Sequence, residues 1–197
     1  RPVNDELYFA AVALALAGVV GVSGNTPGTK ASGEKLASFY GDHALLQGIA
    51  SFLLALRCTA ELLAGGSAPL VEVAYTWTVV DGHAFNVAFY FDRLSAVMTL
   101  VVTGVGSLIH VYSTGYMKED KSYARYFAYL NLFLFFMLLL VLGRSLLVLF
   151  VGWEGVGLAS YLLIGFWFED PDKARAGKKA FVTNRIGDAG FLLGMFA

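Results

Sequence analysis

The sequence has few charged residues and almost no cysteine. Charged side chains make up 15% of its 197 residues and the formal net charge is −1, so nothing indicates binding of nucleic acid. The single cysteine, Cys58, lies in an apolar run and cannot form an internal disulfide, so its expected role is packing. The sequence contains no Cys/His cluster at metal-ligand spacing and no glycine-rich phosphate loop. We therefore expect no redox cofactor on this chain.

Apolar residues dominate instead. Hydrophobic side chains account for 57% of the chain, and the mean hydropathy of +0.65 lies outside the range of soluble domains. The pattern predicts an all-α membrane protein with about six transmembrane helices and a short extramembrane β-hairpin. The expected spans are Leu7–Val22, Ala44–Ala64, Leu94–Tyr116, Tyr126–Leu142, Phe150–Trp167 and a sixth that starts near Ala176.

The connections between these spans differ in character. Residues Ser23–Asp42 are polar and are expected to form a loop. In Gly65–Phe91, apolar and polar residues alternate up to an Asp81-Gly82 turn, and Val87–Phe91 can return as the second strand. This segment is therefore predicted to be the β-hairpin.

One stretch organises the rest of the chain. The fifth predicted span is apolar throughout except for Glu154 near its middle. An ionisable group at that depth is costly and usually belongs to an ion or proton route. Gly152, Gly155 and Ala159 recur at three- and four-residue spacing, which lets a neighbouring helix approach closely.

The next helix carries a second acid. Glu154 lies about ten residues into its helix from one side and Asp188 about ten into the next from the other, so each is roughly 15 Å deep. Two carboxyl groups that meet near the midplane favour holding a proton, which makes the pair a candidate proton site. Arg185 lies three residues before Asp188 on one helix face, either as a structural ion-pair partner or as part of the site.

Two other polar positions have simpler interpretations. His110 is expected to hydrogen-bond a neighbouring helix near the interface, and a proton relay is the less favoured alternative. Arg57 and Glu61 lie four residues apart on one helix face, where mutual neutralisation is favoured over a pathway.

Basic residues predict the orientation. With six spans, the loops after the first, third and fifth helices share one side, and that side is the more basic. The positive-inside rule assigns it to the cytoplasm or matrix, with the N-terminus and hairpin in the periplasm or intermembrane space. The basic residues are Lys30, Lys35, Lys118, Lys121, Arg125, Lys173 and Arg175, against Arg1, Arg93 and Arg144 on the other side.

From Phe91 onward the chain resembles a known family. Stretches 91–95, 102–110, 126–133, 152–167 and 179–188 are similar to the largest antiporter-like membrane subunit of respiratory complex I, in its bacterial and mitochondrial forms. The N-terminal third resembles that family only in layout. Related Mrp cation/proton antiporter subunits share the plan, but Gly155-Val156-Gly157 after the Trp-Glu pair points to complex I.

The resemblance implies a function and a site. Glu154 corresponds to the family's fifth-helix glutamate in the proton-translocation machinery, and Arg185 and Asp188 match polar residues of its sixth helix. The glutamate works with a lysine on a broken seventh helix, which this chain does not include. NADH, FMN, iron–sulfur clusters and quinone would bind elsewhere in the complex. The alternatives are an Mrp-type sodium/proton antiporter or membrane-bound hydrogenase subunit, and a non-conducting scaffold derived from one.

The same resemblance divides the chain and predicts its surroundings. Residues 1–91 form a two-helix segment with the β-hairpin, and residues 92–197 form the start of the antiporter-like domain. The expected partners are other membrane subunits of complex I, the lipid bilayer and a second chain that supplies the remaining helices. The chain begins with Arg1 and not with methionine, so it is either processed or cut from a longer chain. If the subunit is naturally split into two polypeptides, a processed N-terminus suggests import into mitochondria. The expected location is therefore the mitochondrial inner membrane, with the bacterial plasma membrane as the alternative.

Overall fold

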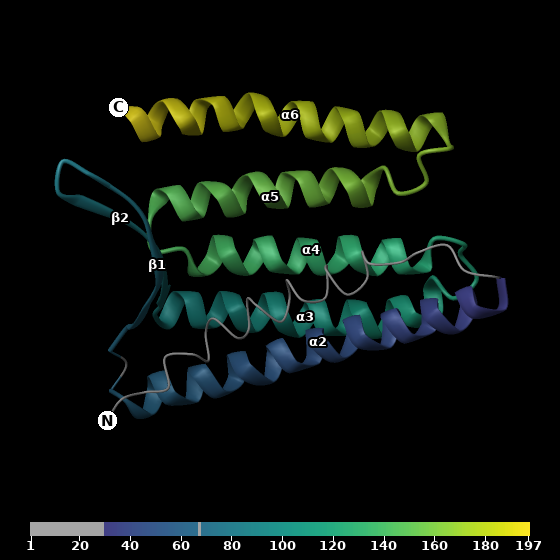
Figure 1. The fold of residues 1–197 in the computed structure, drawn as a ribbon, viewed down its shortest axis with the longest axis horizontal. Helices are drawn as coiled ribbons and strands as arrows, with labels where there is room; N and C mark the ends of the chain where they lie inside the picture. The colour runs from purple at the N-terminus through teal and green to yellow at the C-terminus, as the bar shows by residue number, and fades with distance from the viewer. Residues whose placement is uncertain (1–29, 67) are drawn as a thin grey trace.

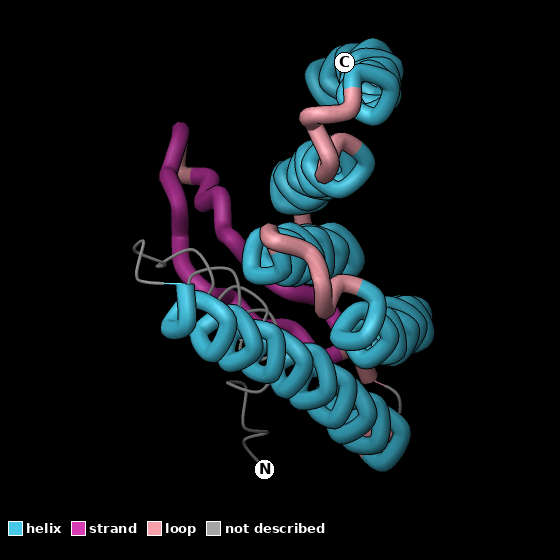
Figure 2. The backbone as a smooth tube through the Cα atoms, turned by 90° about the vertical axis from the view of Figure 1, so that its right-hand side faces the viewer, coloured by secondary structure: helices cyan, strands magenta, loops and turns pink. Residues whose placement is uncertain are grey.

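The computed structural model describes residues 30–66 and 68–197, which form five helices and one β-hairpin. Figure 1 shows the five helices side by side with their axes close to parallel, and the hairpin at one end of them. In the end-on view of Figure 2, α4, α5 and α6 form a row and α2 crosses beside α3 and α4. The elements are α2 (Lys30–Ala64), β1 (Leu70–Val80), β2 (His83–Phe91), α3 (Arg93–Tyr116), α4 (Tyr123–Leu142), α5 (Leu146–Ile164) and α6 (Pro171–Phe196).

Four described helical stretches are long and apolar enough to cross a membrane. They are His43–Ala64, Arg93–Tyr116, Tyr123–Leu142 and Leu146–Ile164, which agree with the second to fifth predicted spans. The predicted span Leu7–Val22 lies outside the described residues. Helix α6 forms as predicted, but its charged residues make it too polar to count as a span by composition. Six spans are therefore not confirmed.

One predicted loop is partly wrong. The segment Ser23–Asp42 was expected to be irregular, yet α2 begins at Lys30 and runs without a break to Ala64. The segment from Lys30 to Asp42 contains several good helix formers, including Ala, Leu, Lys and Glu. Polarity alone therefore did not exclude a helix in this segment.

The β-hairpin forms where the alternation predicted it. β1 pairs antiparallel with β2. Leu70 lies opposite Phe91 at the open end of the hairpin, and Val80 lies opposite His83 beside the turn. Asp81 and Gly82 both have positive φ, of 49° and 78°, which is the geometry of a two-residue type I′ turn. The second strand begins at His83, four residues earlier than expected.

The hairpin is tied to the helices at its open end. The Arg144 backbone N–H donates to Ala88 O at 3.0 Å, and Phe89 forms a β-bridge with Gly143. Phe89 and Phe91 are buried in a cluster with residues of α2, α3, α4 and α5. The predicted tight turn at 143–145 therefore connects α4 to α5 and also anchors the hairpin.

Polar caps define the first turns of α3 and α5. The Ser95 N–H donates to the Asp92 carboxylate at 2.8 Å, and the Val148 N–H donates to Ser145 Oγ at 3.3 Å. The hydrogen bond from Ser95 lowers the pKa of Asp92 below its ordinary value. The stabilisation from this cap is therefore present above the pKa of an unfolded aspartate and is lost as the pH falls through the folded value.

Helices α4 and α5 pack closely because α5 presents small residues to α4. Gly152, Gly155 and Ala159 are all buried, as their spacing predicted. A Cβ atom on Gly152 would lie 2.5 Å from the Leu140 backbone N, and one on Gly155 would overlap the ring of Phe136. The neighbouring Gly157 has nothing within 4 Å of such an atom.

We predict that Gly152→Ala destabilises the α4–α5 contact by about 1–3 kcal/mol, because the backbone of Leu140 must move. Gly157→Ala is the matched control, since the same methyl group meets no neighbour there. Thermal unfolding of the detergent-solubilised protein measures both. Equal midpoints for the two variants would contradict the close approach.

Candidate functional site

The site lies between α5 and α6, which run antiparallel beside each other (Figure 1). The short connection between them keeps them close, and a Cβ atom on Gly177 of α6 would lie 3.2 Å from the backbone N of Gly165, a tight contact. Asp170 caps α6 by accepting from the Asp172 N–H at 3.0 Å. The charged residues of α6 are thereby placed along the exposed side of α5.

Glu154 lies near the middle of α5. It is eight residues from Leu146 and ten from Ile164, or about 12 Å and about 15 Å along the axis. Gly152 and Gly155 direct one face of the helix to α4, so Glu154 is turned toward α6. Its side chain is 20% exposed.

An arginine bridges the two acids. Arg185 Nη1 forms an ion pair with Glu154 Oε2 and lies 3.9 Å from Asp188 Oδ2. The Asp188 side chain is only 7% exposed. Arg185 also lies over the ring of Phe181, with Cζ 4.9 Å from the ring centroid, an arrangement that favours the cation.

A tryptophan holds Asp188 in place. Trp153 Nε1 donates to Asp188 Oδ1 at 2.7 Å. Its ring stacks on Phe191, with an interplanar angle of 8°, and Phe191 also stacks on Phe150. The sequence analysis missed this role, although the signal was present in an indole N–H beside Glu154 in an apolar helix.

The structure therefore changes the predicted site in one respect. Glu154 and Asp188 do belong to one cluster, but the Arg185 guanidinium lies between them and they do not form a direct carboxyl pair. Two carboxylates and one guanidinium leave one net negative charge. Glu154 Oε1 is buried and has no hydrogen-bond partner among the described residues. The cluster can accept one further positive charge or one proton at that oxygen.

The other predicted polar residues lie elsewhere. His110 is fully buried in α3 and contacts Asn131 of α4, so the expected bond to a neighbouring helix is confirmed. Arg57 and Glu61 form an ion pair of 3.1 Å on the exposed side of α2, as expected for mutual neutralisation. Cys58 of α2 is buried in the hydrophobic cluster that also contains Phe89 and Phe91. Among the side chains that the structure describes (residues 43–66, 68–79, 81–82 and 84–197), no group of three or more His, Cys, Asp and Glu residues could hold a metal ion.

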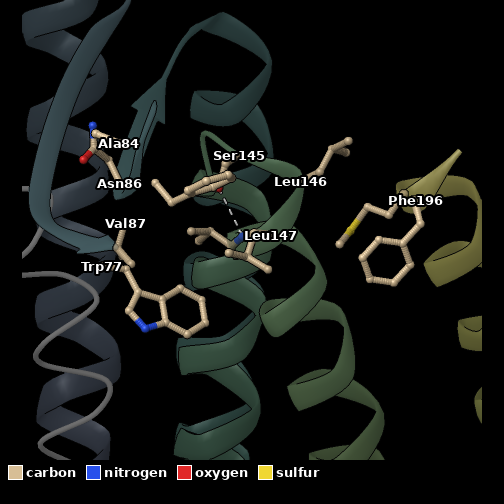
Figure 3. Close-up of a pocket in the computed structure, with 11 residues that line it drawn as sticks. Trp77, Ala84, Asn86, Val87, Ser145, Leu146, Leu147 and Phe196 are labelled. Atoms are coloured by element: carbon tan, nitrogen blue, oxygen red, sulfur yellow. Dashed lines mark hydrogen bonds between the residues drawn. The ribbon is translucent and has the colours of Figure 1, made fainter. Parts of the chain in front are cut away.

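An apolar hollow of about 480 Å³ lies apart from the charged cluster (Figure 3). Trp77 and residues 84–87 of the hairpin form one wall, and residues 145–148 at the start of α5 form another. Met195 and Phe196 at the end of α6 complete it. None of the lining residues is ionisable, so the hollow is not part of the charged site.

Comparison with known proteins connects this geometry to a family. Residues 77–127 match the family described as the N-terminus of NADH-ubiquinone oxidoreductase (complex I) chain 5. Residues 143–197 match the transmembrane family of NADH:quinone oxidoreductase and Mrp antiporters. The chain is 50% identical over 157 residues to NADH-quinone oxidoreductase subunit L of Mycobacterium tuberculosis, which covers 77% of this chain and 25% of the relative.

The chain belongs to the complex I subunit L/chain 5 family. It is 41% identical over 198 residues to subunit L of Neisseria meningitidis, covering 98% of this chain and 28% of the relative. It is 46% identical over 149 residues to NADH-ubiquinone oxidoreductase chain 5 of Allomyces macrogynus, and this match covers 75% of this chain and 23% of the relative. The chain thus spans about a quarter of the length of these family members.

A solved structure confirms the fold at greater evolutionary distance. A chain of the membrane-bound sulfane sulfur reductase, an archaeal respiratory membrane complex, superimposes with a TM-score of 0.76 at 18% identity. The match covers 96% of this chain and 36% of that one. The helical arrangement is therefore the antiporter-like membrane fold that the resemblance implied.

We predict that Trp153→Phe destabilises the α5–α6 contact by about 1.5–3 kcal/mol, the usual range for a hydrogen bond to a charged group. The variant keeps an aromatic ring to stack on Phe191 but leaves buried Asp188 without its donor. Trp167→Phe is the matched control, because Trp167 Nε1 donates to Asp120 at an exposed site where water can replace it. Denaturant unfolding measures both, and equal losses would show that the buried bond has no special value.

Proposed function

We propose that this chain contributes to proton translocation as a membrane subunit of NADH:quinone oxidoreductase. The observation that supports this most directly is the Glu154–Arg185–Asp188 cluster, located halfway along α5 in a chain of the subunit L/chain 5 family. An ionisable cluster at that depth is costly unless it serves a transport pathway. Glu154 is the proton-accepting group, Arg185 the mobile cation and Asp188 its second anchor.

The distances suggest how the cluster works. Arg185 is paired closely with Glu154 and loosely with Asp188, at 3.9 Å. Protonation of Glu154 removes the charge that holds Arg185, so the guanidinium moves the short way to Asp188. Loss of the proton returns it to Glu154. The unpartnered Oε1 is the atom on which the proton enters.

This role requires α6 to span the membrane. Its 26 residues extend about 39 Å, which exceeds the hydrocarbon thickness of about 30 Å. The charges near its middle are directed at α5, whereas Val182, Ile186 and Leu193 are strongly exposed and suit lipid or a neighbouring helix. With the predicted N-terminal span, this gives the six transmembrane helices expected from the sequence.

The placement in the membrane follows from the two ends of the helices. The connections after α3 and α5 lie at one end and carry most of the basic residues, and the hairpin lies at the opposite end (Figure 1). We assign the basic end to the cytoplasm or matrix by the positive-inside rule. The membrane is the mitochondrial inner membrane or the bacterial plasma membrane, and the relatives include proteins of both sources.

In this proposal the redox chemistry belongs to other subunits. NADH, FMN, iron–sulfur clusters and quinone bind elsewhere in the complex, and this chain converts their turnover into proton movement. Its partners are the neighbouring membrane subunits and the helices that complete the subunit itself.

A second function is favoured by one observation. Residues 143–197 match a family that also includes Mrp antiporters, and a cluster with one net negative charge could equally bind a sodium ion. Purification of the native assembly separates the two. Complex I predicts co-purifying NADH oxidation with flavin and iron–sulfur clusters, and an antiporter predicts neither.

We predict that Glu154→Gln in the intact complex lowers the number of protons pumped per NADH while assembly is preserved, because the amide keeps the shape but cannot titrate. Glu61→Gln is the matched control, since Glu61 is paired with Arg57 on an exposed helix face. Proton uptake into sealed vesicles measures both. Wild-type pumping by an assembled Glu154→Gln complex would refute the assigned role.

We predict that a cysteine at position 77 is labelled by an impermeant thiol reagent added from the periplasm or intermembrane space, because Trp77 is exposed on the hairpin. A cysteine at position 175, in the exposed first turns of α6, should be labelled only from the opposite side. Labelling of both positions from the same side would contradict the topology.

A further inference from the structure

A second line of buried polar groups runs along α3, away from the charged cluster. One face of α3 presents a polar side chain every three or four residues, and each is at most 8% exposed. We call this row the polar seam; it consists of Thr99, Thr103, Ser107, His110 and Ser113. Such a row is expensive in a membrane helix unless the groups bind one another or a neighbour.

Only some of the polar side chains in and around the seam have hydrogen-bond partners. Thr103 Oγ1 donates to Thr99 O and Ser107 Oγ donates to Thr103 O, each at 2.7 Å. Opposite it, Ser51 Oγ of α2 is buried without a hydrogen-bond partner among the described residues. At the other end, Ser113 Oγ lies 3.3 Å from the hydroxyl of Tyr126 on α4. The seam therefore contains both proton donors and open acceptors.

His110 is the only ionisable side chain among the five residues of the seam, and the ordinary pKa of histidine lies near neutral. Its ring lies 6.0 Å from that of Phe127, and a Cβ on Gly48 of α2 would be 3.6 Å away. Among the side chains that the structure describes, at residues 43–66, 68–79, 81–82 and 84–197, no charged group hydrogen-bonds to the ring or stacks on it. Two phenols lie close by on α4: Tyr126, which contacts Ser113, and Tyr123, whose ring contacts Phe127.

The two hydrogen bonds of His110 impose a choice of protonation state. Nδ1 lies 2.7 Å from Gly106 O, and a carbonyl oxygen can only accept, so Nδ1 must carry a proton. Nε2 lies 3.3 Å from Asn131 Oδ1, which is also an acceptor. With the amide in this orientation, a hydrogen bond to Oδ1 requires a proton on Nε2 as well, so this arrangement suits the cationic ring.

After rotation of its amide group, Asn131 can also hydrogen-bond to the neutral His110 ring. When Nε2 has no proton it needs a donor, and the Asn131 NH₂ group becomes that donor after a half-turn. Asn131 Nδ2 is buried and has no other hydrogen-bond partner among the described residues, so the half-turn breaks no bond there. Asn131 can thus satisfy His110 in both protonation states without any helix moving.

We propose that His110 and Asn131 form a second reversible proton-binding site, in which protonation of Nε2 is coupled to rotation of the Asn131 amide. It lies between α3 and α4, whereas the charged cluster lies between α5 and α6. The inference concerns protonation of this residue and does not depend on the function proposed for Glu154.

The test is a pH titration of the full-length subunit in its complex, in membranes, by solid-state NMR with ¹⁵N-labelled histidine. The His110 signals are assigned by their loss in His110→Gln, or in His110→Asn if the first variant does not assemble. Between about pH 5 and about pH 9 we expect Nε2 to change from protonated to unprotonated, with Nδ1 protonated throughout. A ring that keeps one protonation state over this range, or that loses the proton from Nδ1, overturns the proposal.

Two variants test whether the Asn131 amide takes part in the titration of His110. Asn131→Asp can accept but not donate, so we expect it to hold both ring nitrogens protonated over the same range. Ser107→Ala is the matched control, because the Ser107 hydroxyl donates to Thr103 O of its own helix and not to the ring. It should leave the titration unchanged. An Asn131→Asp titration identical to the wild type would show that the amide plays no part in proton binding.

Discussion

The ion pair between Arg185 and Glu154 is the interaction on which the arrangement of α5 and α6 depends. Glu154 lies in an otherwise apolar helix, where an unpaired carboxylate would be strongly unfavourable. Arg185 supplies the opposite charge, and Trp153 and the guanidinium together hold Asp188. This pairing also explains how so polar a helix as α6 can lie along α5. Its central charges, Arg185 and Asp188, each have a partner on α5.

The features that the sequence predicted well depend on local pattern. Apolar runs identified four spans, alternation identified the hairpin, and the spacing of Gly152, Gly155 and Ala159 identified the α4 contact. In each case the pattern itself determines the structure, because a helix or strand repeats its side-chain directions at a fixed period. The start of α2 at Lys30 was not predicted, because a polar segment can form either a helix or a loop and composition alone does not distinguish the two.

The features that the sequence could not predict depend on the rotation and depth of one helix relative to another. Spacing placed Glu154 and Asp188 at similar depths, but whether Arg185 would lie beside them or between them depends on how α6 is turned. The bond from Trp153 to Asp188 and the pairing of His110 with Asn131 depend on the same kind of information. Helix α6 has charges on several faces, so its hydropathy gave no single preferred side. The approach of the two helices, and not the periodicity of either, decides these contacts.

The attachment of the hairpin to the turn at Gly143 and Arg144 has a mechanical consequence. That turn joins the hairpin to the end of α4 and the beginning of α5. Helix α5 also packs closely against α4, because Gly152 and Gly155 have no side chains. Helix α6 approaches the α5 end of this assembly closely at Gly177, and further along it contacts α5 through side chains. Glu154 therefore lies on a backbone held against α4, whereas its opposite charge reaches it from α6 on the long side chain of Arg185. The hairpin, through the turn at Gly143 and Arg144, thus helps to fix the position of the acid, and α6 determines the charge beside it.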